Sequence, residues 1–484
     1  MTLFAKGRFG FFHHIPSLFL GWLIFSSFAL ILLLTSCQSL VSPGQSVHNQ
    51  SLELTLNVPK RWLNSVNLEF QENAWLQDFD SPTLEALVKE AILYNYDLRA
   101  AAARLDQARQ QLIIVGANRI PSVSANLEVK RSKIASEIAS ADSTLKPNLN
   151  FNWELDIWGR LKDSRNAAFQ DWQFEKATLK GARLSLAAQT AKAWISVIEA
   201  HLKVKLSQQQ AKSFAESADQ AQKDYNQGLG TALNIKPLLT NLANEQARLS
   251  ALERQRTQAI LALELLLGRY PTETIEPANE LPSIPEQIPA GLPAQLLERR
   301  PDLRAANKRV IASSYRASAA FKLLLPSINL TGVLGTSSDS LKSLLKGDYS
   351  LWSIAGNLFQ PIFQGHRLRA QYEKAQRAID EAVANYTSTA LKAFREVELA
   401  LSRESSLRRQ IDFLYLAQQK ANDEKELMEQ QYRRGLVGIT NVLTSERKVF
   451  TAKNDLIATQ SLLLQNRIDL YLALGGEFER ITHP

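Results

Sequence analysis

The chain of 484 residues repeats one long pattern, and this duplication constrains its fold more than any other feature. Three short motifs recur at an offset of 205 residues and three more at an offset of 207, as Asp97–Ala101 with Asp302–Ala306, Pro121–Val123 with Pro326–Ile328, Ile157–Trp158 with Ile362–Phe363, Tyr225 with Tyr432, Gly228–Leu229 with Gly435–Leu436, and Leu267–Gly268 with Leu474–Gly475. The change of offset indicates one two-residue insertion near 364–366. Because the period far exceeds the 20 to 50 residues of solenoid repeats, we infer two copies of one large unit.

Alternation of apolar and polar residues predicts two strands in each copy. It is clearest in 147–158, where Leu149, Phe151, Trp153, Leu155 and Ile157 alternate with asparagines and carboxylates. Such a strand has one apolar and one polar face, and ten residues suffice to cross a bilayer at a tilt. A strand of a soluble sandwich alternates in the same way, so the flanking chain has to decide. We place the four strands at about 119–131, 147–158, 324–335 and 349–363.

Two very long helices follow the paired strands. Residues 161–227 contain no proline and one glycine, and residues 366–434 contain neither. At 1.5 Å per residue, each segment forms a rod of roughly 100 Å. Glycine-containing turns at 228–231 and 435–438 end these rods, and return helices are predicted at 232–267 and 439–474. A further helix begins after Ser81, a suitable N-cap before Pro82, and is expected to run to about Asn118.

The first 36 residues have the features of an export signal. A basic start is followed by an apolar run that ends in Leu34-Thr35-Ser36-Cys37, and Cys37 is the only cysteine. This ending resembles the lipobox of bacterial lipoproteins, which implies cleavage before Cys37 and attachment of diacylglycerol and N-acyl lipid to it. The alternative is a free thiol after a transmembrane anchor. Gln38, in place of an aspartate, favours the outer membrane over the inner one.

The whole chain divides by composition into six segments: signal peptide 1–36, anchored arm 37–80, first repeat 81–270, proline-rich linker 271–292, second repeat 293–475 and tail 476–484. The net charge of +8 is dispersed over helical segments, which indicates a solvated surface and no nucleic-acid partner. No metal-binding histidine motif, phosphate loop or nucleophile elbow occurs. We therefore expect no enzyme activity, no metal and no cofactor beyond the lipid on Cys37.

Four strands are too few to close a membrane barrel, which needs about eight. Open sheet edges cannot face lipid. Either the strands lie outside a membrane, or several chains share one barrel, and three chains would supply twelve strands. Alanine-rich helical faces also call for packing between neighbouring chains.

This arrangement resembles the TolC-like outer-membrane efflux proteins, and among them the NodT-like lipoprotein partners of RND-type drug pumps. The motifs that carry the resemblance are Glu298–Leu303, Leu323–Ile328, Asn357–Phe363 with Gly365 and Arg367–Ala370, and Leu472–Gly476. The resemblance implies a mainly α fold with a small membrane β-barrel: a homotrimer with a twelve-stranded barrel in the outer membrane above a long α-helical tunnel in the periplasm. Function would be passive conduction of small molecules, as an exit duct docked to a periplasmic adaptor and an inner-membrane pump. The loops 131–146 and 335–348 would be extracellular.

The resemblance also places a gate after the second turn, where family members carry acidic residues that narrow the pore. Here the matching positions are Asn441 and Thr444, with Arg447 nearby, so we expect a hydrogen-bonded or steric gate. The alternative is that Asn441 only caps a helix and Arg447 is a surface charge. For adaptor docking at the rod tips we assign Gly228, Leu229, Gly435, Leu436 and Val437. Ordinary capping by glycine is the alternative there, although exposed Leu and Val at a tip favour a partner.

Two other functions fit parts of the sequence. A lipid-anchored periplasmic coiled-coil scaffold without a pore would explain the rods but not the strands placed identically in both copies. A type I protein-secretion duct would share the fold. The transported substrate leaves no trace in the sequence, because a passive duct need not recognise it.

Overall fold

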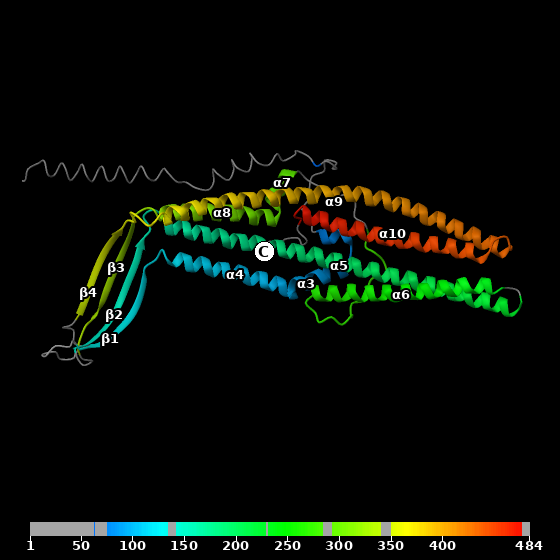
Figure 1. Ribbon diagram of the computed structural model, residues 1–484, viewed down its shortest axis with the longest axis horizontal. Coiled ribbons are helices and arrows are strands. Elements are labelled where there is room, and N and C mark those ends of the chain that lie inside the picture. Colours follow the sequence, from blue (N-terminus) through cyan, green and yellow to red (C-terminus); the bar gives the residue numbers. More distant parts are fainter. Residues whose placement is uncertain are drawn as a thin grey trace, which may run out of the picture.

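The computed structural model describes residues 62, 75–133, 142–228, 231–283, 293–339 and 350–476. They form a long bundle of helices with a four-stranded antiparallel sheet that projects from one end (Figure 1). The export signal, Cys37 and most of the arm 37–80 lie outside the described residues. Over the described ranges, no helix combines the length with the apolar character that crossing a membrane requires.

The two halves of the chain repeat one order of elements: helix, two strands, long helix, return helix. The first copy comprises α4 (Tyr96–Ala117), β1 (Ser122–Ser132), β2 (Asp142–Leu155), α5 (Arg160–Asn226) and α6 (Ala232–Leu266). The second comprises α8 (Pro301–Lys322), β3 (Ser327–Thr336), β4 (Ser350–Phe359), α9 (Arg367–Arg433) and α10 (Ile439–Ala473). Corresponding helices have equal lengths of 22, 67 and 35 residues.

Shorter elements precede each copy. The 3-10 helix η1 (Trp75–Phe79) and α3 (Pro82–Tyr94) lie before α4, and α7 (Pro293–Arg299) lies before α8. Ser81 is the N-cap of α3, with its hydroxyl accepting from the Leu84 N–H, and Pro82 follows at the first helical position, as the sequence predicts.

The prediction of one continuous helix from Ser81 to about Asn118 is wrong, because the helix is interrupted at Asn95. This residue has an extended backbone, and its Oδ1 accepts the Leu98 N–H at 3.0 Å to cap α4. Its Nδ2 donates to the Leu266 carbonyl at 3.0 Å at the end of α6. An asparagine side chain can bond to nearby backbone groups in place of the helical hydrogen bonds. Here the additional bond to the Leu266 carbonyl favours the interrupted helix.

The two 67-residue helices run the whole length of the bundle (Figure 1). α4 and α8 pack beside them near the sheet, while α6 and α10 pack beside them at the far end. The buried positions Leu184, Ala187, Ala191, Trp194 and Ile198 recur every three or four residues along α5. This helical spacing turns one apolar stripe towards the neighbouring helices.

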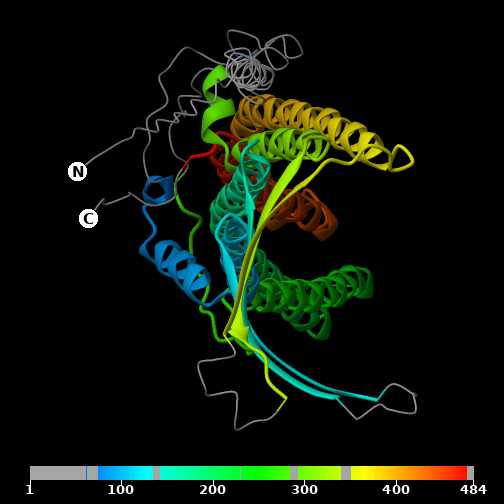
Figure 2. The same ribbon diagram turned by 90° about the vertical axis from the view of Figure 1, so that its left-hand side faces the viewer.

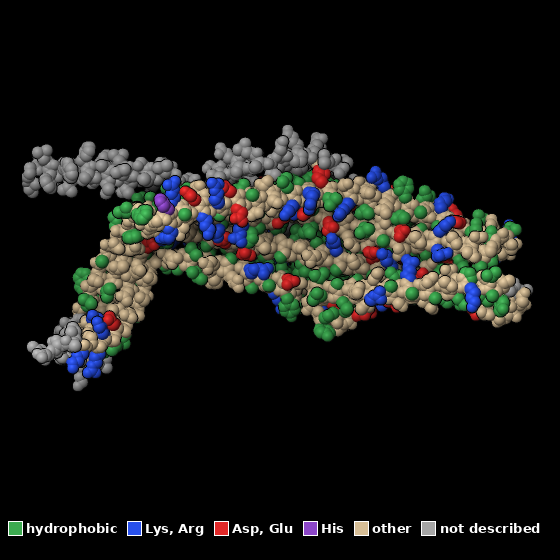
Figure 3. Space-filling model, viewed as in Figure 1, with side chains coloured by type: hydrophobic (Ala, Val, Ile, Leu, Met, Phe, Trp, Pro, Cys, Tyr) green, Lys and Arg blue, Asp and Glu red, His purple; other side chains and the backbone are tan. Residues whose placement is uncertain are grey.

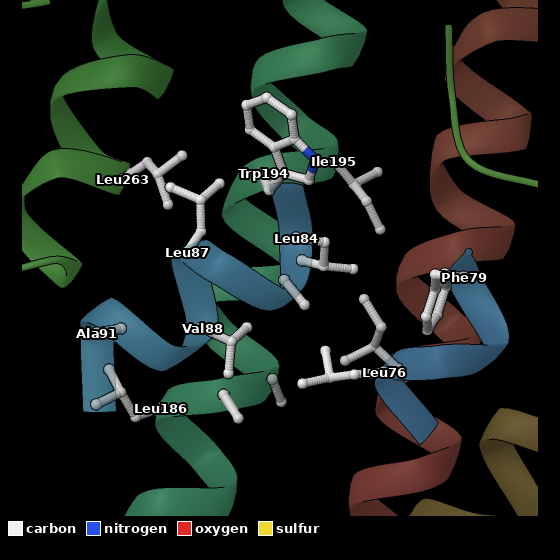
Figure 4. Close-up of a cluster of buried hydrophobic side chains, with 14 of the residues drawn as sticks. Leu76, Phe79, Leu84, Leu87, Val88, Ala91, Leu186, Trp194, Ile195 and Leu263 are labelled. Carbon is white, nitrogen blue, oxygen red and sulfur yellow. The ribbon is translucent and has the colours of Figure 1, made fainter. Parts of the chain in front are cut away.

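A large apolar core surrounds α3, near the middle of the bundle in Figure 1, and Figure 4 shows its side chains. Leu84, Leu87 and Val88 of α3 pack against Trp194 of α5 and Leu263 of α6. Burial of each such side chain contributes about 1.5–3 kcal/mol to stability. This core fixes α3 across α5 and α6 and so ties the chain before the first repeat to its long helices.

Trp75 of η1 extends this core to the second repeat. Its indole stacks on the Tyr471 ring of α10, with ring centroids 5.7 Å apart. Of the expected arm 37–80, the structure describes Trp62 and residues 75–80. Trp62 also contacts the second repeat, with its ring centroid 6.1 Å from that of Phe394 in α9.

The sheet order is β1-β2-β3-β4, with every neighbouring pair antiparallel. The first hairpin loop, expected at 131–146, is shorter, because β2 begins at Asp142 and Lys146 pairs with Glu128. Cross-strand pairing therefore overrides the polar character of this segment. The strand expected at 147–158 ends at Leu155, where the joint to α5 begins. The strand expected at 349–363 ends at Phe359, shortly before Pro361, which cannot donate to a ladder.

The joints between sheet and long helices differ between the copies. Before α5, the Asp156 carboxylate accepts the Leu161 and Lys162 N–H groups at 2.9 and 2.7 Å, and Gly159 supplies a left-handed turn at φ +74°. Before α9, His366 adopts φ +62° and caps the helix with no side-chain hydrogen bond. The first joint is thus held by a carboxylate cap, and the second is not.

Candidate functional site

The strand register collects the apolar side chains on one face of the sheet. Paired residues on neighbouring strands lie on the same face. Leu149 pairs with Leu334, which pairs with Trp352, and this row is apolar throughout. In the row that contains Asn152, Thr331 and Ala355, the side chains are polar or small. The apolar side chains of β4 are exposed, with Trp352, Ile354 and Leu358 at 73, 78 and 67 %. An apolar face of this extent requires lipid or another apolar surface.

The opposite face of the sheet is polar but uncharged at its centre. Asn148, Asn150 and Asn152 line β2, and the Asn150 amide donates to the Asn148 Oδ1 at 2.9 Å. Charge gathers instead at the free end of the sheet, where Figure 3 shows Lys and Arg side chains and where Lys130 and Arg131 lie on β1. Seen end-on in Figure 2, the strands curve as a single arc. A two-faced, curved sheet matches a segment of a barrel wall around a wet interior.

Both edges of this sheet are open in the described part of the chain. β1 pairs only with β2, and β4 pairs only with β3. Each edge therefore presents unpaired backbone donors and acceptors, which a strand from another chain can satisfy.

The three gate positions lie together on one exposed face at the start of α10. Asn441, Thr444 and Arg447 are all exposed. The Thr444 hydroxyl donates to the Thr440 carbonyl at 2.8 Å. The side chains of Asn441 and Arg447 have no polar partner among the described residues. The alternative that Asn441 caps this helix is wrong, because α10 begins at Ile439 with Gly438 as its N-cap.

Behind this face lies a polar contact that the sequence reasoning missed. Glu446 is 4 % exposed, and its Oε1 accepts the Ser213 hydroxyl of α5 at 2.5 Å, with Lys425 Nζ of α9 at 3.9 Å. One carboxylate thus connects α10 to both long helices. The available signal was a glutamate between Leu443 and Val449 in the buried stripe of α10.

A second ion pair joins the same helices on the surface. Lys448 Nζ of α10 lies 2.7 Å from the Glu424 carboxylate of α9. Both side chains are more than one-third exposed, so water screens this pair, and it contributes at most about 1 kcal/mol. The buried Glu446 contact is therefore the stronger determinant of how the tip of α10 sits against the long helices.

The first glycine of each tip turn has the same backbone conformation. Gly228 and Gly435 both have φ +74°, a left-handed conformation that favours glycine. The Leu436 N–H donates to the Gln431 carbonyl at 3.0 Å, which closes the helix end. Leu436 is nevertheless 69 % exposed, whereas Val437 is half-buried. Leu229 lies outside the described residues. The backbone hydrogen bond already ends the helix, so the exposed leucine side chain is not needed for capping.

Electrostatics at the first tip are simple. Lys223, in the last turn of α5, lies 2.6 Å from Asp219, and this hydrogen bond and charge raise the pKa of the lysine above 10.5. Across the described ranges, no three His, Cys, Asp or Glu side chains gather in a way that could hold a metal.

The sequence and the fold of this chain are similar to those of known proteins. The model of the outer membrane efflux protein family matches residues 87–269 and 292–476. The outer membrane protein OprJ of Pseudomonas aeruginosa is 30 % identical over 84 % of this chain and 86 % of its own length. The probable efflux pump outer membrane protein TtgC of Pseudomonas putida is 28 % identical over 85 and 87 %. The crystal structure of the open state of the Neisseria gonorrhoeae MtrE outer membrane channel superposes with a TM-score of 0.80, at 27 % identity over 89 and 98 %.

Proposed function

Because the chain belongs to the outer membrane efflux protein family, we propose that three copies build the exit duct of a tripartite efflux system. The protein is an outer-membrane component of an efflux pump. In the proposed assembly, twelve strands form the barrel and the long helices form a tunnel in the periplasm, which a periplasmic adaptor joins to an inner-membrane RND-type pump. Small molecules, drugs and toxic compounds among them, pass through without chemistry.

The observation that carries this proposal is the sheet with one apolar face and two open edges. A single chain cannot satisfy these edges in lipid, whereas β4 of one copy beside β1 of the next can close a ring. The helices behind the sheet support the same arrangement. At 67 residues, each long helix spans roughly 100 Å, far more than the 30 Å of a bilayer core.

The test is to purify the full chain in detergent, measure its mass, and record its conductance in planar bilayers. A trimer that migrates differently after heating and passes ions is the expected result. A lone subunit that never conducts would contradict the proposal.

Deletion of the gene should raise drug susceptibility and leave protein export unchanged, which separates small-molecule efflux from secretion. A scaffold without a pore leaves the exposed apolar face of the sheet unexplained.

We further propose that Cys37 carries diacylglycerol and an N-acyl chain after cleavage of residues 1–36. The support is the solitary cysteine after a short apolar run with small residues before it. Palmitate labelling should mark the wild-type chain and disappear in Cys37→Ala, while the position of the trimer on electrophoresis stays the same. Label that persists in the variant would place the lipid elsewhere.

We propose that Asn441, Thr444 and Arg447 narrow the periplasmic end of the duct. This proposal is supported by the exposed face that the three residues share. Among the described residues, the side chains of Asn441 and Arg447 have no polar partner. Asn441→Ala combined with Thr444→Ala should raise single-channel conductance, as should Arg447→Ala. Asn234→Ala is the matched control, because Asn234 occupies the duplicate position on α6. Unchanged conductance in the gate variants would remove these residues from the constriction.

We propose that the two tip turns, with Gly228, Leu229, Gly435, Leu436 and Val437, dock the adaptor. The exposed Leu436 side chain supports this role. A Leu436→Cys variant that also carries Cys37→Ala should crosslink to the adaptor, whereas a cysteine at exposed Ser353 in the sheet should not. Absence of a crosslink at every tip position would contradict docking there.

A further inference from the structure

A groove of about 650 Å³ lies where α4, α5 and α8 meet the end of α10. Its wall contains Lys176, Lys180 and Arg183 of α5, and Arg304 and Lys308 of α8. Among its described lining residues there is no aspartate or glutamate. Leu105, Leu179 and Leu184 supply an apolar floor, and Gly475 and Gly476, which follow α10, complete the wall.

The positive charges in this groove are poorly balanced by the described residues. Arg304 and Lys308 lie four residues apart on one helix, as do Lys176 and Lys180, and like charges at this spacing destabilise a helix. Among the described residues, Arg183, Arg304 and Lys308 form no ion pair. Lys176 makes only a cation–π contact, 5.9 Å above the Trp172 ring.

Neighbouring Arg300, in contrast to these cations, is neutralised by carboxylates of the chain itself. Its guanidinium lies 2.8 Å from Asp302 and 2.7 Å from Glu396. Burial alone would lower its pKa, but these two carboxylates raise that pKa above its ordinary value. Arg183, Arg304 and Lys308 have no such partners among the described residues, so the groove suits an occupant that carries carboxylates and apolar side chains.

We propose that this occupant is the chain's own segment 477–484, with Glu477 and Glu479 paired to Arg183, Arg304 and Lys308. The segment reads Glu-Phe-Glu-Arg-Ile-Thr-His-Pro, and Glu477 directly follows a residue of the groove wall. Two residues of extended chain cover about 7 Å, so both carboxylates lie within reach of the cations. Phe478 and Ile481 match the apolar floor.

The backbone at Gly475 fixes where this segment leaves α10. Gly475 has φ +71°, and an added Cβ would lie 3.3 Å from the backbone of Arg299 and Arg300. This close approach holds the end of α10 against the start of α8. In the proposed arrangement, the segment ties the end of the second repeat to α5 of the first.

Trypsin tests the proposal on the intact trimer, because Arg480 is a cleavage site within the segment. Mass spectrometry of the subunit reports loss of residues 481–484 after mild digestion. Arg304→Glu with Lys308→Glu should speed this cleavage about fivefold or more, the effect expected when two exposed ion pairs are lost. Lys236→Glu with Arg254→Glu, on exposed positions of α6, changes the net charge equally and should have no effect.

Charge exchange then identifies the occupant. Glu477→Lys with Glu479→Lys should free the segment alone, and combining it with the two glutamates on α8 should restore protection. Because the two lysines add trypsin sites, these variants and the wild type are compared by chymotrypsin cleavage after Phe478. If the combined variant is no better protected than either parent, the segment does not occupy the groove. If inorganic phosphate raises the melting temperature of the wild-type trimer while the segment is freely cleaved, the groove binds a soluble anion and the proposal fails. Conductance is not part of this readout, so the result is independent of the proposed duct.

Discussion

At the scale of single residues, two similar contacts have different consequences. Ser207 donates to Glu245 of α6, and Ser213 donates to Glu446 of α10, both at 2.5 Å between oxygens. The first bond stays within the first repeat, whereas the second joins the two repeats. Sequence reasoning selected the exposed residues beside Glu446 and missed Glu446 itself, because its partner lies 233 positions away in the chain.

These two serines form a matched pair of variants. Either Ser213→Ala or Ser207→Ala leaves a buried carboxylate without its hydroxyl donor, which should lower stability by about 1–3 kcal/mol. Only Ser213→Ala loosens α10 from α5 next to the proposed gate, so only this variant should raise single-channel conductance. Bilayer recordings beside thermal melting of both proteins check this. Equal conductance of the two variants would mean that the Ser213 bond is structural alone.

At the scale of elements, the sequence predicts the long helices well and the strands less well. The prediction of 161–227 lies within one residue of α5, because 67 residues without proline favour one helix. Strand ends depend on partners that the sequence does not reveal. Leu145 and Lys146 belong to β2 only because Val129 and Glu128 pair with them. The break at Asn95 likewise depends on a carbonyl at Leu266.

The two faces of the sheet predict opposite responses to one new charge. Ile354 and Ser353 are neighbours on β4, but only Ile354 lies on the apolar face. Ile354→Arg should cost about 2–4 kcal/mol per chain in lipid and reduce the trimer recovered from outer-membrane fractions. Ser353→Arg should insert normally. Quantitative blotting of heated and unheated samples measures both. Equal recovery of the two variants would contradict the assignment of the faces.

At the scale of the whole molecule, one carboxylate organises the described part of the linker between the repeats. Glu264, fully buried at the end of α6, accepts the N–H groups of Thr272, Glu273 and Thr274 at 2.7, 3.0 and 2.8 Å. Burial alone would raise its pKa, but these bonds lower the pKa below 4.5. The proline content of 271–292 predicts a linker, whereas this anchoring residue, eight to ten positions away, was not predicted.

The pH dependence of the linker follows from this pKa. A carboxyl with a lowered folded pKa stabilises the native state above its unfolded value, and this contribution is lost as pH falls through the folded pKa. Hydrogen exchange of residues 271–283 should therefore quicken between neutral pH and about pH 3, after correction for the intrinsic rate. Glu264→Gln should exchange quickly throughout, and Glu276→Gln, at an exposed carboxylate of the same linker, should behave as wild type. Acid-independent protection in the wild type would rule out this anchor.

The unequal joints below the sheet bear on how force would travel through an assembled duct. Asp156 clamps one long helix to its strand, while the joint at His366 has no such clamp. In a ring of three chains, stiff and compliant connections would alternate, so six similar columns would meet the barrel with only threefold mechanical symmetry. A twist applied at the far tips would bend the compliant joints first and leave the barrel wall nearly undistorted.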